Sequence, residues 1–424
     1  MSYQMYALRR KDFIADIKEA HPAKDGVVVL FAGFEGEERR FTQESSFYYL
    51  TGLNEPSLVL VMDLQGKTTL YIPNCMEERS KWVVAPLEMT AEYAKKIGVD
   101  EVKLLGSSCN GYQMHPFFPQ SEYEQLLKDV DAQLKNSNTM FTFAPETQHG
   151  YVEQRLVLQR LQSFGFKPEV IDVSPIVARL RRSKDMHEME LMYKAVDITC
   201  LAQDAAAKAI SNDMTEAEVQ ASLEYIIIGS QAEPSFPSIV GSGKNAAILH
   251  YTENNGIMKN GDLVVVDIGA RYKQYCADIT RTYPVSGKFT DRQKEIYTIV
   301  LETQEYIAER AKPGVWLSNA DKPAESLNHL AKAFIKEKGY EQYFPHGIGH
   351  FLGLDVHDVG DYKEPLKEGD VITIEPGIYI KDENIGIRIE DDYWIIKDGA
   401  ICLSEGLPKS IKEIEQMVQE KFSE

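Results

Sequence analysis

Hydrophobic positions in the first part of the chain follow two periods, one typical of strands and one typical of helices. Short runs rich in valine, leucine and isoleucine, bounded by glycine, proline or aspartate, predict strands. These runs are Val27–Phe31, Leu58–Asp63 and Thr68–Ile72. Gln120–Lys135 and Val152–Phe164 instead carry apolar residues at helical spacing. The pattern predicts an α/β domain, which we expect to end near Asp172.

Helix starts are clearer in the rest of the chain. In a capping box, a side-chain oxygen accepts a bond from the backbone N–H three residues later, and a Glu or Gln at that position returns the bond. The spacing begins at Asp185, Thr215, Thr290 and Ser410. Pro323 suits a first helical position, and Gly339 suits a helix end.

An internal repeat relates two parts of this region. Residues 261–269 and 369–377 share a Gly-Asp turn, an apolar run, a carboxylate, one residue and a glycine, at an offset of 108 positions. The same offset carries Thr215 onto Pro323, the expected start of a second helix. We therefore predict two copies of helix–helix–strands over about residues 173–405, followed by a closing helix.

Each copy contains two carboxylates that we expect to face each other across a hairpin. They are Asp267 and Asp278 in the first copy, and Glu375 and Glu390 in the second. Cross-strand partners lie at equal distances from the turn, which would fall at 272–273 and 382–383. Two like charges this close cannot both stay ionised without a neutralising partner. One such carboxylate is most often an exposed strand residue, but two facing pairs predict bound metal cations.

Three of the nine histidines, His346, His350 and His357, lie within twelve residues. The spacing of the first two occurs in zincin helices, but the glutamate of H-E-x-x-H is missing and the two intervening glycines argue against a helix. We expect a glycine-rich loop that aims imidazoles into a site. One imidazole with four carboxylates favours manganese, with cobalt or iron as alternatives, over a structural zinc. The implied reaction class is metal-assisted hydrolysis.

Composition narrows the partners and the compartment. The chain has 46 basic and 65 acidic residues, a net charge of −19, which disfavours nucleic acid as a partner. Its five cysteines include no C-x-x-C pair, which argues against a disulfide framework and a thiolate zinc site. No apolar run is long enough for a bilayer, and none follows the basic N-terminal residues. We expect a soluble, cytoplasmic protein without a signal peptide or a membrane association.

Other catalytic motifs are incomplete. Residues 241–244, Gly-Ser-Gly-Lys, look like part of a phosphate loop, but Ser238 stands where the first glycine is required, and Asn245 replaces Ser or Thr. No G-x-S-x-G nucleophile elbow is present, and no cysteine has a persuasive catalytic context.

Residues from about 175 to 420 resemble the catalytic domain of the pita-bread metallopeptidases, which include methionine aminopeptidase, aminopeptidase P, prolidase and creatinase. The resemblance implies an α+β architecture: a pita-bread catalytic domain with an internal pseudo-two-fold repeat at 173–424, behind a smaller α/β domain at 1–172. It also implies two divalent ions, manganese first, with Co²⁺, Fe²⁺ or Zn²⁺ as alternatives. The metal ligands it implies are Asp267, Asp278, His350, Glu375 and Glu390, with Asp278 and Glu390 as the bridging carboxylates.

The proline-specific branch of this family provides further similarities. Residues 248–251 are similar to the motif of its first histidine, 375–379 and 386–390 to its strand motifs, and 40–52 to the signature of the aminopeptidase P N-terminal domain. The catalytic residues that this implies are His250, His346, His357, Glu375, Tyr379 and Arg388. In that branch the second and third histidines contact the substrate and stabilise the oxyanion, and the glutamate is the expected proton shuttle. The branch's Trp-rich segment is only loosely matched around Trp82.

Three functions follow from these similarities. The first is an Xaa-Pro aminopeptidase, which releases the N-terminal residue from peptides with proline in second position. The second is an Xaa-Pro dipeptidase, and the third is a non-catalytic peptide-binding protein that has kept the fold. Only fourteen residues separate Glu375 from Glu390, too few for the insertion expected of larger prolidases, which favours the aminopeptidase. The resemblance also implies a homodimer or homotetramer.

Overall fold

The structure is a computed structural model that describes residues 3–36, 40–109, 111, 115–135, 137–145 and 150–420. The chain divides into two compact units, Met1–Arg181 and Arg182–Glu424. The division falls at the end of helix α7, Ser174–Arg182, rather than at Asp172, where strand β6 ends. None of the described helices is long and apolar enough to cross a membrane.

Hydrogen bonds explain why α7 is counted with the first unit. The Tyr49 hydroxyl donates to the carbonyl of Leu180 at 3.2 Å, and Arg181 Nη1 donates to Ser46 Oγ at 2.8 Å. The next residue, Arg182, instead forms an ion pair with Asp370 of the second unit, with Nη2 and Oδ2 2.8 Å apart. Helix α7 therefore continues the first unit for one helix beyond β6.

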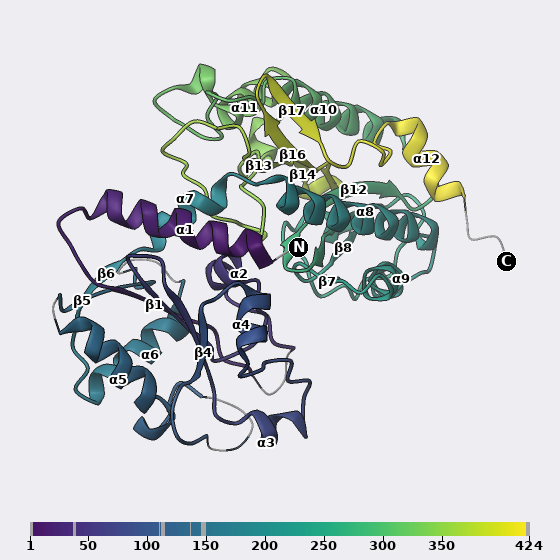
Figure 1. The fold of residues 1–424 in the computed structure, drawn as a ribbon. Coiled ribbons are helices and arrows are strands. Elements are labelled where there is room, and N and C mark those ends of the chain that lie inside the picture. Colours follow the sequence, from purple (N-terminus) through teal and green to yellow (C-terminus); the bar gives the residue numbers. More distant parts are fainter. Residues whose placement is uncertain are drawn as a thin grey trace. The chain divides into compact units, whose positions relative to one another are not determined.

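The first unit is built on one mixed sheet with the strand order β4-β3-β2-β1-β5-β6. Its elements are α1 Tyr3–Ala20, β1 Val27–Phe31, α2 Ser45–Thr51, β2 Val59–Asp63, β3 Thr68–Ile72, α3 Met76–Ser80, α4 Ala91–Ile97, β4 Glu101–Leu104, α5 Glu124–Leu134, β5 Thr139–Thr142, α6 Val152–Ser163 and β6 Glu169–Asp172. Alternate residues of β1 and β2 pack with α5 and α6 in one apolar core, and Figure 1 shows these two helices side by side against the sheet. The predicted α/β domain is confirmed.

The second unit consists of two helix–helix–strands halves and a closing helix. The first half contains α8 Met186–Ala209, α9 Glu216–Gly229, β7 Glu233–Pro234, β8 Ile239–Ser242, β9 Leu263–Ile268, β10 Ala270–Tyr272, β11 Tyr275–Cys276 and β12 Ile279–Pro284. The second half and the closing helix contain α10 Asp291–Ala308, α11 Leu327–Glu337, β13 Val371–Ile374, β14 Gly377–Ile380, β15 Ile385–Arg388, β16 Asp391–Ile396, β17 Gly399–Cys402 and α12 Ile411–Gln419. This order confirms the predicted repeat.

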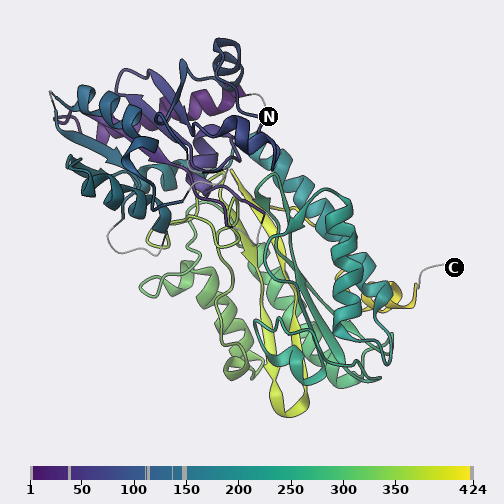
Figure 2. The same ribbon diagram turned by 90° about the horizontal axis from the view of Figure 1, so that it is seen from below.

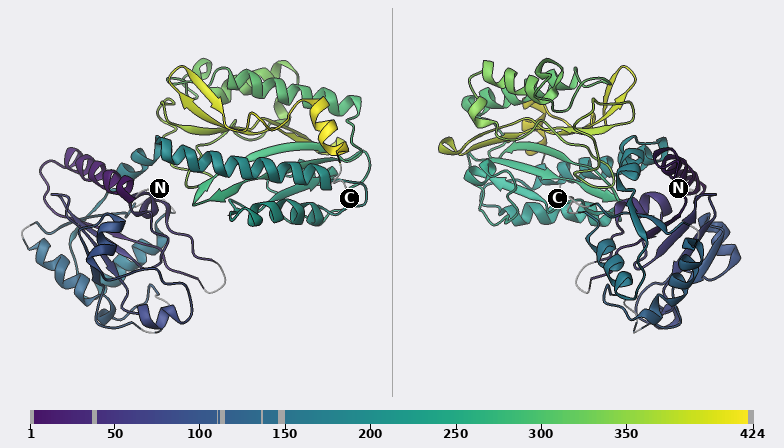
Figure 3. Two further views of the ribbon diagram at one scale, coloured as in Figure 1. Left: turned by 45° about the vertical axis from the view of Figure 1, so that its right-hand side comes forward. Right: turned by 90° about the vertical axis from the view of Figure 1, so that its left-hand side faces the viewer.

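The strands of this unit lie between the helices of its two halves. Helix α8 packs on β9, β10, β11 and β12, and α10 packs on β13, β14 and β15. Figures 2 and 3 show the strands running between the teal helices of the first half and the green helices of the second. Residues that point inward from both sets of strands can therefore meet in one central layer.

The predicted helix starts are largely confirmed. Complete capping boxes begin α8, α9, α10 and α12, where each N-cap side chain and each third helical residue exchange bonds with the backbone. Pro323 is an exception, because it begins a short 3-10 turn, Pro323–Glu325, and α11 starts only at Leu327. Ser326 separates the two, since it is extended and bridges to Trp316.

Strand register decides how the carboxylates meet. In the second half, β14 pairs with β15 and β13 with β16 in one continuous register that sets Glu375 opposite Glu390, as predicted. In the first half Asp267 pairs with Thr280, so Asp278 lies two residues away from the predicted position. The turn falls on Lys273 and Gln274, which both have positive φ, and not on 272–273. A slip of two keeps Asp278 on the same face of the sheet, because side chains alternate with a period of two.

Candidate metal centre

A cavity of about 700 Å³ is lined by residues from both halves of the second unit. Nine of the ten predicted site residues line it: His250, Asp267, Asp278, His346, His350, His357, Glu375, Arg388 and Glu390. The tenth, Tyr379, lies behind this layer, where its hydroxyl accepts a bond from Arg388 Nη1 at 2.8 Å. The fold thus brings together residues that are up to 140 positions apart in the sequence, from His250 to Glu390.

Asp278, His350 and Glu390 form the tightest part of this group. One ligand atom from each lies within 4.8 Å of the others, and all three side chains are buried. His350 Nε2 lies 3.4 Å from Asp278 Oδ2 and 3.8 Å from Glu375 Oε1. The charge of Asp267 acts on Asp278, and Asp267 Oδ1 is buried without a hydrogen-bond partner among the described residues. These oxygens surround a space of the size that a divalent cation occupies.

The tautomer of His350 also fits a metal ligand. Its Nδ1 lies 3.1 Å from the carbonyl oxygen of Phe351, and because a carbonyl only accepts, Nδ1 carries the hydrogen. Nε2 is therefore the nitrogen that faces the two carboxylates, and it is the ring nitrogen available to bind a metal ion. The loop is held in place by Thr373, whose Oγ1 accepts from His350 N at 3.1 Å. Gly349 is required there, since a Cβ would lie 2.0 Å from the carbonyl oxygen of Thr373.

Burial dominates the electrostatics of the carboxylates. Loss of solvation, and then the charge of Asp267, raise the pKa of Asp278 well above its usual range. Burial, Asp278 and Glu375 do the same to the pKa of Glu390, and burial raises the pKa of Glu375 to about 7. The group can be neutralised by protons or by metal ions, and the two compete for the same oxygens.

A directed chain of hydrogen bonds runs along the side of the cavity. Arg388 Nη2 bonds to Asp267 Oδ2 at 2.6 Å, and its Nη1 donates to the Tyr379 hydroxyl. That hydroxyl lies 3.0 Å from His346 Nε2, while His346 Nδ1 donates to the carbonyl of Gly347 at 2.8 Å. Burial and the charge of Arg388 lower the pKa of His346 to about 4, so its imidazole is neutral and Nε2 accepts from the hydroxyl.

This chain changes what His346 can do. Both of its nitrogens are engaged, so it has no N–H left for a substrate oxyanion, the task that the family resemblance implies for it and His357. The ring of His357 lies 4.2 Å from that of His350, and no hydrogen bond from His357 to another described residue is formed. Of the two histidines, His357 is therefore better placed to donate to a substrate.

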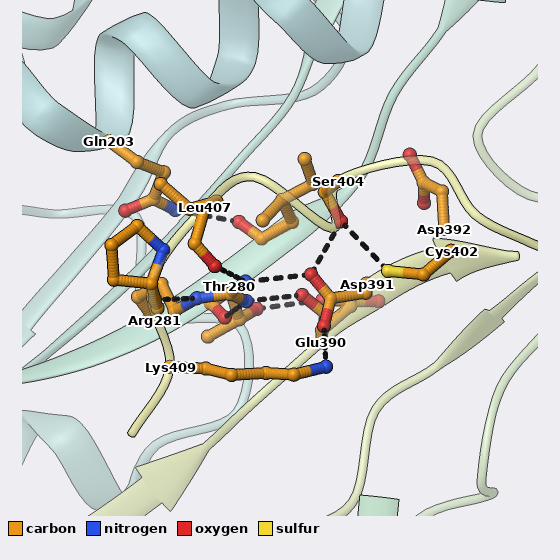
Figure 4. Close-up of polar contacts among 12 residues, drawn as sticks. Gln203, Thr280, Arg281, Glu390, Asp391, Asp392, Cys402, Ser404, Leu407 and Lys409 are labelled. Carbon is orange, nitrogen blue, oxygen red and sulfur yellow. Dashed lines mark hydrogen bonds and ion pairs between the residues drawn. The ribbon is translucent and has the colours of Figure 1, made fainter. Parts of the chain in front are cut away.

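A fully bonded network lies behind Glu390 (Figure 4). Arg281 and Asp391, both completely buried, form an ion pair at 2.7 Å, and Arg281 Nη1 also donates to the carbonyls of Thr280 and Glu390. The Thr280 hydroxyl donates to Glu390 Oε2 at 2.7 Å. Asp391 in turn accepts from Lys409 Nζ at 2.9 Å. Because each partner is satisfied, the network can fix the backbone and carboxylate of Glu390 without leaving a buried charge unpaired.

A second buried carboxylate, Glu216, organises the loop that carries His250. Its Oε1 accepts from Ser242 N and Oγ, both at 2.7 Å, and from Asn245 Nδ2 at 3.0 Å. Its Oε2 accepts from the Tyr251 hydroxyl at 2.8 Å and from the backbone of Gly256 at 2.7 Å. The Gly-Ser-Gly-Lys motif at 241–244 is thus part of a loop built around a carboxylate, not around a phosphate.

Sequence reasoning did not find Glu216, Thr280, Arg281 or Asp391. Thr280 had a usable signal, because it lies two positions after Asp278 and so shares its face of the sheet. Glu216 looked like an ordinary first-turn acid of a capped helix. Arg281 gave no sign of burial, since its partner Asp391 lies 110 positions away.

Comparisons with known proteins agree with this geometry. The model of metallopeptidase family M24 matches residues 190–397, and that of the aminopeptidase P N-terminal domain matches residues 6–108. The chain is 32% identical to the Xaa-Pro aminopeptidase of Haemophilus influenzae, over 93% of each chain. The chain belongs to metallopeptidase family M24. Divalent metal ions are implied by membership of this family, and the oxygen-rich set around His350 fits them.

Two further M24 relatives bear on fold and function. The structure of Escherichia coli aminopeptidase P with the inhibitor Pro-Leu superposes with a TM-score of 0.82 and 28% identity, covering 99% of this chain and 98% of that one. This likeness confirms the predicted two-domain pita-bread architecture. The Xaa-Pro dipeptidase of Pyrococcus furiosus is 37% identical over 68% of this chain and 84% of its own length. The protein is a metallopeptidase of the aminopeptidase P type.

We expect the stabilising effect of metal to grow with pH. Folding raises the pKa of Glu375 to about 7 and also raises the pKa values of Asp278 and Glu390. The metal-free folded state therefore binds protons that the unfolded state has released. That contribution to stability is present at low pH and is lost as the pH rises through 7. Saturating Mn²⁺ should therefore raise the melting temperature by at least about 5 °C more at pH 8 than at pH 5.5.

Differential scanning fluorimetry of the protein with and without Mn²⁺ measures this difference. Asp278→Asn should lose most of the gain, whereas Glu253→Gln, which removes an acid outside the cavity lining, should keep it. A gain that is the same at both pH values would contradict the competition between protons and metal.

We expect Glu216 to act on catalysis through His250. Glu216→Gln replaces one acceptor oxygen with an NH₂ group that faces existing donors, which should displace the loop and lower kcat/KM by about 10- to 100-fold. The matched control is Glu218→Gln on the same helix, because Glu218 is an exposed capping residue. A double-mutant cycle with His250→Ala tests whether Glu216 acts through His250. In the His250→Ala background, Glu216→Gln should lower kcat/KM only slightly further. Additive losses would show that Glu216 acts elsewhere.

Proposed function

We propose that this protein is an Xaa-Pro aminopeptidase that uses two divalent ions, preferably Mn²⁺, held by the five predicted ligands. The observation that carries the proposal is the buried meeting of carboxylates with a correctly oriented imidazole in a cavity lined by three further histidines. The proposed ligands are Asp267, Asp278, His350, Glu375 and Glu390. The buried Oδ1 of Asp267, which has no hydrogen-bond partner among the described residues, and the orientation of His350 Nε2 toward two carboxylates support their assignment as ligands.

Bound divalent cations supply Lewis-acid chemistry at such a centre, where they lower the pKa of a water molecule and polarise a peptide carbonyl. The proline nitrogen must receive a proton as the bond breaks, because it would otherwise leave as a strongly basic amide anion. Glu375 is the proposed carrier, because its carboxylate lines the cavity beside His350 and the other proposed ligands.

The remaining residues orient the peptide. His250 and His357 line the cavity and are proposed to hold the substrate, with His357 donating to the developing oxyanion. Arg388 is proposed to hold Asp267 in position, and Tyr379 and His346 to keep the Arg388 side chain aligned. The dimer or tetramer and the cytoplasmic location stay predictions.

The dipeptidase is kept as a second candidate because of the Pyrococcus furiosus relative. One observation favours the aminopeptidase: β14 and β15 are joined by only the four residues 381–384, with Asn384 in the left-handed region at φ 53°. This tight turn adds no segment that could close the cavity beyond the second substrate residue.

Hydrolysis of Arg-Pro-Pro with added Mn²⁺ tests the aminopeptidase proposal. Glu375→Gln and His350→Ala should each lower kcat by about a thousandfold, because they remove the proton carrier and a metal ligand. Glu383→Gln, on the exposed turn of the same hairpin, is the matched control and should be close to native. Chelation should abolish activity, and re-addition of single metals should rank Mn²⁺ first. Full activity in either site variant would refute the mechanism.

Peptide length separates the two candidates. An aminopeptidase with an open cleft should cleave Ala-Pro-Ala at least about tenfold more efficiently than Ala-Pro, since the longer peptide makes further contacts that stabilise the transition state. Measuring kcat/KM for both by release of free alanine gives the ratio. The reverse preference would establish the dipeptidase.

A further inference from the structure

The cavity contains a cation that the proposed mechanism does not use. Arg271 lies on β10 and lines the same cavity as the proposed metal ligands. It is paired across the strands with Glu233 of β7 and lies next to lining residues from two segments, Ser235–Pro237 and Val356–His357. Arg388, the other arginine of the cavity, already forms an ion pair with Asp267. Arg271 differs from it in that, within the described part of the chain, no carboxylate forms an ion pair with its guanidinium, although the Cys276 thiol lies beside it.

The hydrogen bonds of Arg271 account for only part of its donor capacity. Its Nη2 donates to the carbonyl oxygen of Ser235 at 3.1 Å, whereas its Nε is buried without a hydrogen-bond partner. Among the described residues, no carboxylate oxygen lies within the ion-pair distance of 4.0 Å from its guanidinium. Glu233 and Asp355 act on it only at longer range. Burial raises the pKa of the adjacent Cys276 thiol to about 12, so that thiol is neutral and brings no compensating charge.

A guanidinium in this position favours one kind of ligand. Its five donors form a planar fork that matches a carboxylate with two parallel bonds, and partial burial strengthens such a pair relative to water. The lining of the same cavity includes the apolar side chains of Phe236 and Val356, which offer no competing acceptors. A carboxylate brought in by a substrate would therefore complete the bonding of Arg271.

We propose that Arg271 is a specificity-determining residue that binds a carboxylate of the substrate. This inference rests on the proposed function and adds the substrate class: peptides that present an anionic group to the Arg271 side of the cavity. Two sources supply that group, the side chain of an acidic first residue and the free C-terminus of a short peptide. The second source would suit a dipeptidase, so the origin of the carboxylate also bears on the choice between the two candidate activities.

Matched peptides distinguish the two sources. Glu-Pro-Leu amide against Gln-Pro-Leu amide compares an acidic with a neutral first residue of the same shape, and both lack a free C-terminus. Leu-Pro acid against Leu-Pro amide compares the C-terminus alone. We expect one of these acid-to-neutral ratios of kcat/KM to be about 10 or more in the native enzyme, and to fall to near one in Arg271→Gln. Arg271→Lys should restore part of the ratio, because it keeps the charge without the fork.

The control is Arg292→Gln, which removes an exposed arginine outside the cavity lining and should leave both ratios as in the native enzyme. Native ratios near one for both pairs, or ratios that are unchanged in Arg271→Gln, would overturn the proposal. Calorimetric binding of the same peptides to Glu375→Gln, with and without Arg271→Gln, measures the ratios independently of turnover. Failure of cleavage would then count against the proposed function, and failure of discrimination would count against the role of Arg271.

Discussion

Confining four carboxylates to one buried cavity is the constraint on which the rest of this structure depends. Charges of one sign are costly to hold at short range away from water, and the raised pKa values of Asp278, Glu375 and Glu390 express that cost. Arg388 forms an ion pair with Asp267, and its charge offsets the raised pKa values of the other three carboxylates only in part. The remaining compensation has to come from protons or metal ions. His350 Nε2 faces the same carboxylates, so a metal ion placed among them would bind the imidazole and the carboxylates together.

The scaffold meets this constraint by surrounding the site with bonded polar groups rather than with apolar packing alone. Arg281 and Asp391 are completely buried, and Arg281 bonds to the carbonyl of the proposed ligand Glu390 and to that of Thr280, two residues after the proposed ligand Asp278. Glu216 does the same for the loop of His250. Both arrangements join segments that are distant in the sequence, so the geometry of the cavity is set by the fold of the whole unit and not by one loop.

Features that depend on residues close together in the sequence could be predicted, whereas features that depend on distant residues could not. A capping box needs only four consecutive residues, and the capping boxes of α8, α9, α10 and α12 were all predicted. Glu375 and Glu390 could be paired by counting from a turn whose chemistry, ending in Asn384, was readable. The predicted cross-strand position of Asp278 was wrong by two residues, because the turn lies at Lys273 and Gln274. Both adopt positive φ, which is unusual for these residue types and could not be predicted from their side chains. Arg281 was missed, since nothing local distinguishes a buried arginine from an exposed one.

The charge balance of the proposed holoenzyme explains why two arginines in one cavity are not redundant. Four carboxylates balance two divalent cations, so Arg388 leaves the centre with about one positive charge in excess, which favours the negative charge that develops on an attacked carbonyl oxygen. Arg271 lies outside this balance, because no carboxylate closes an ion pair with it among the described residues. Its charge is thus free to act on a part of the substrate that does not react. With the roles proposed above, Arg388 would help to stabilise the transition state and Arg271 would select the substrate.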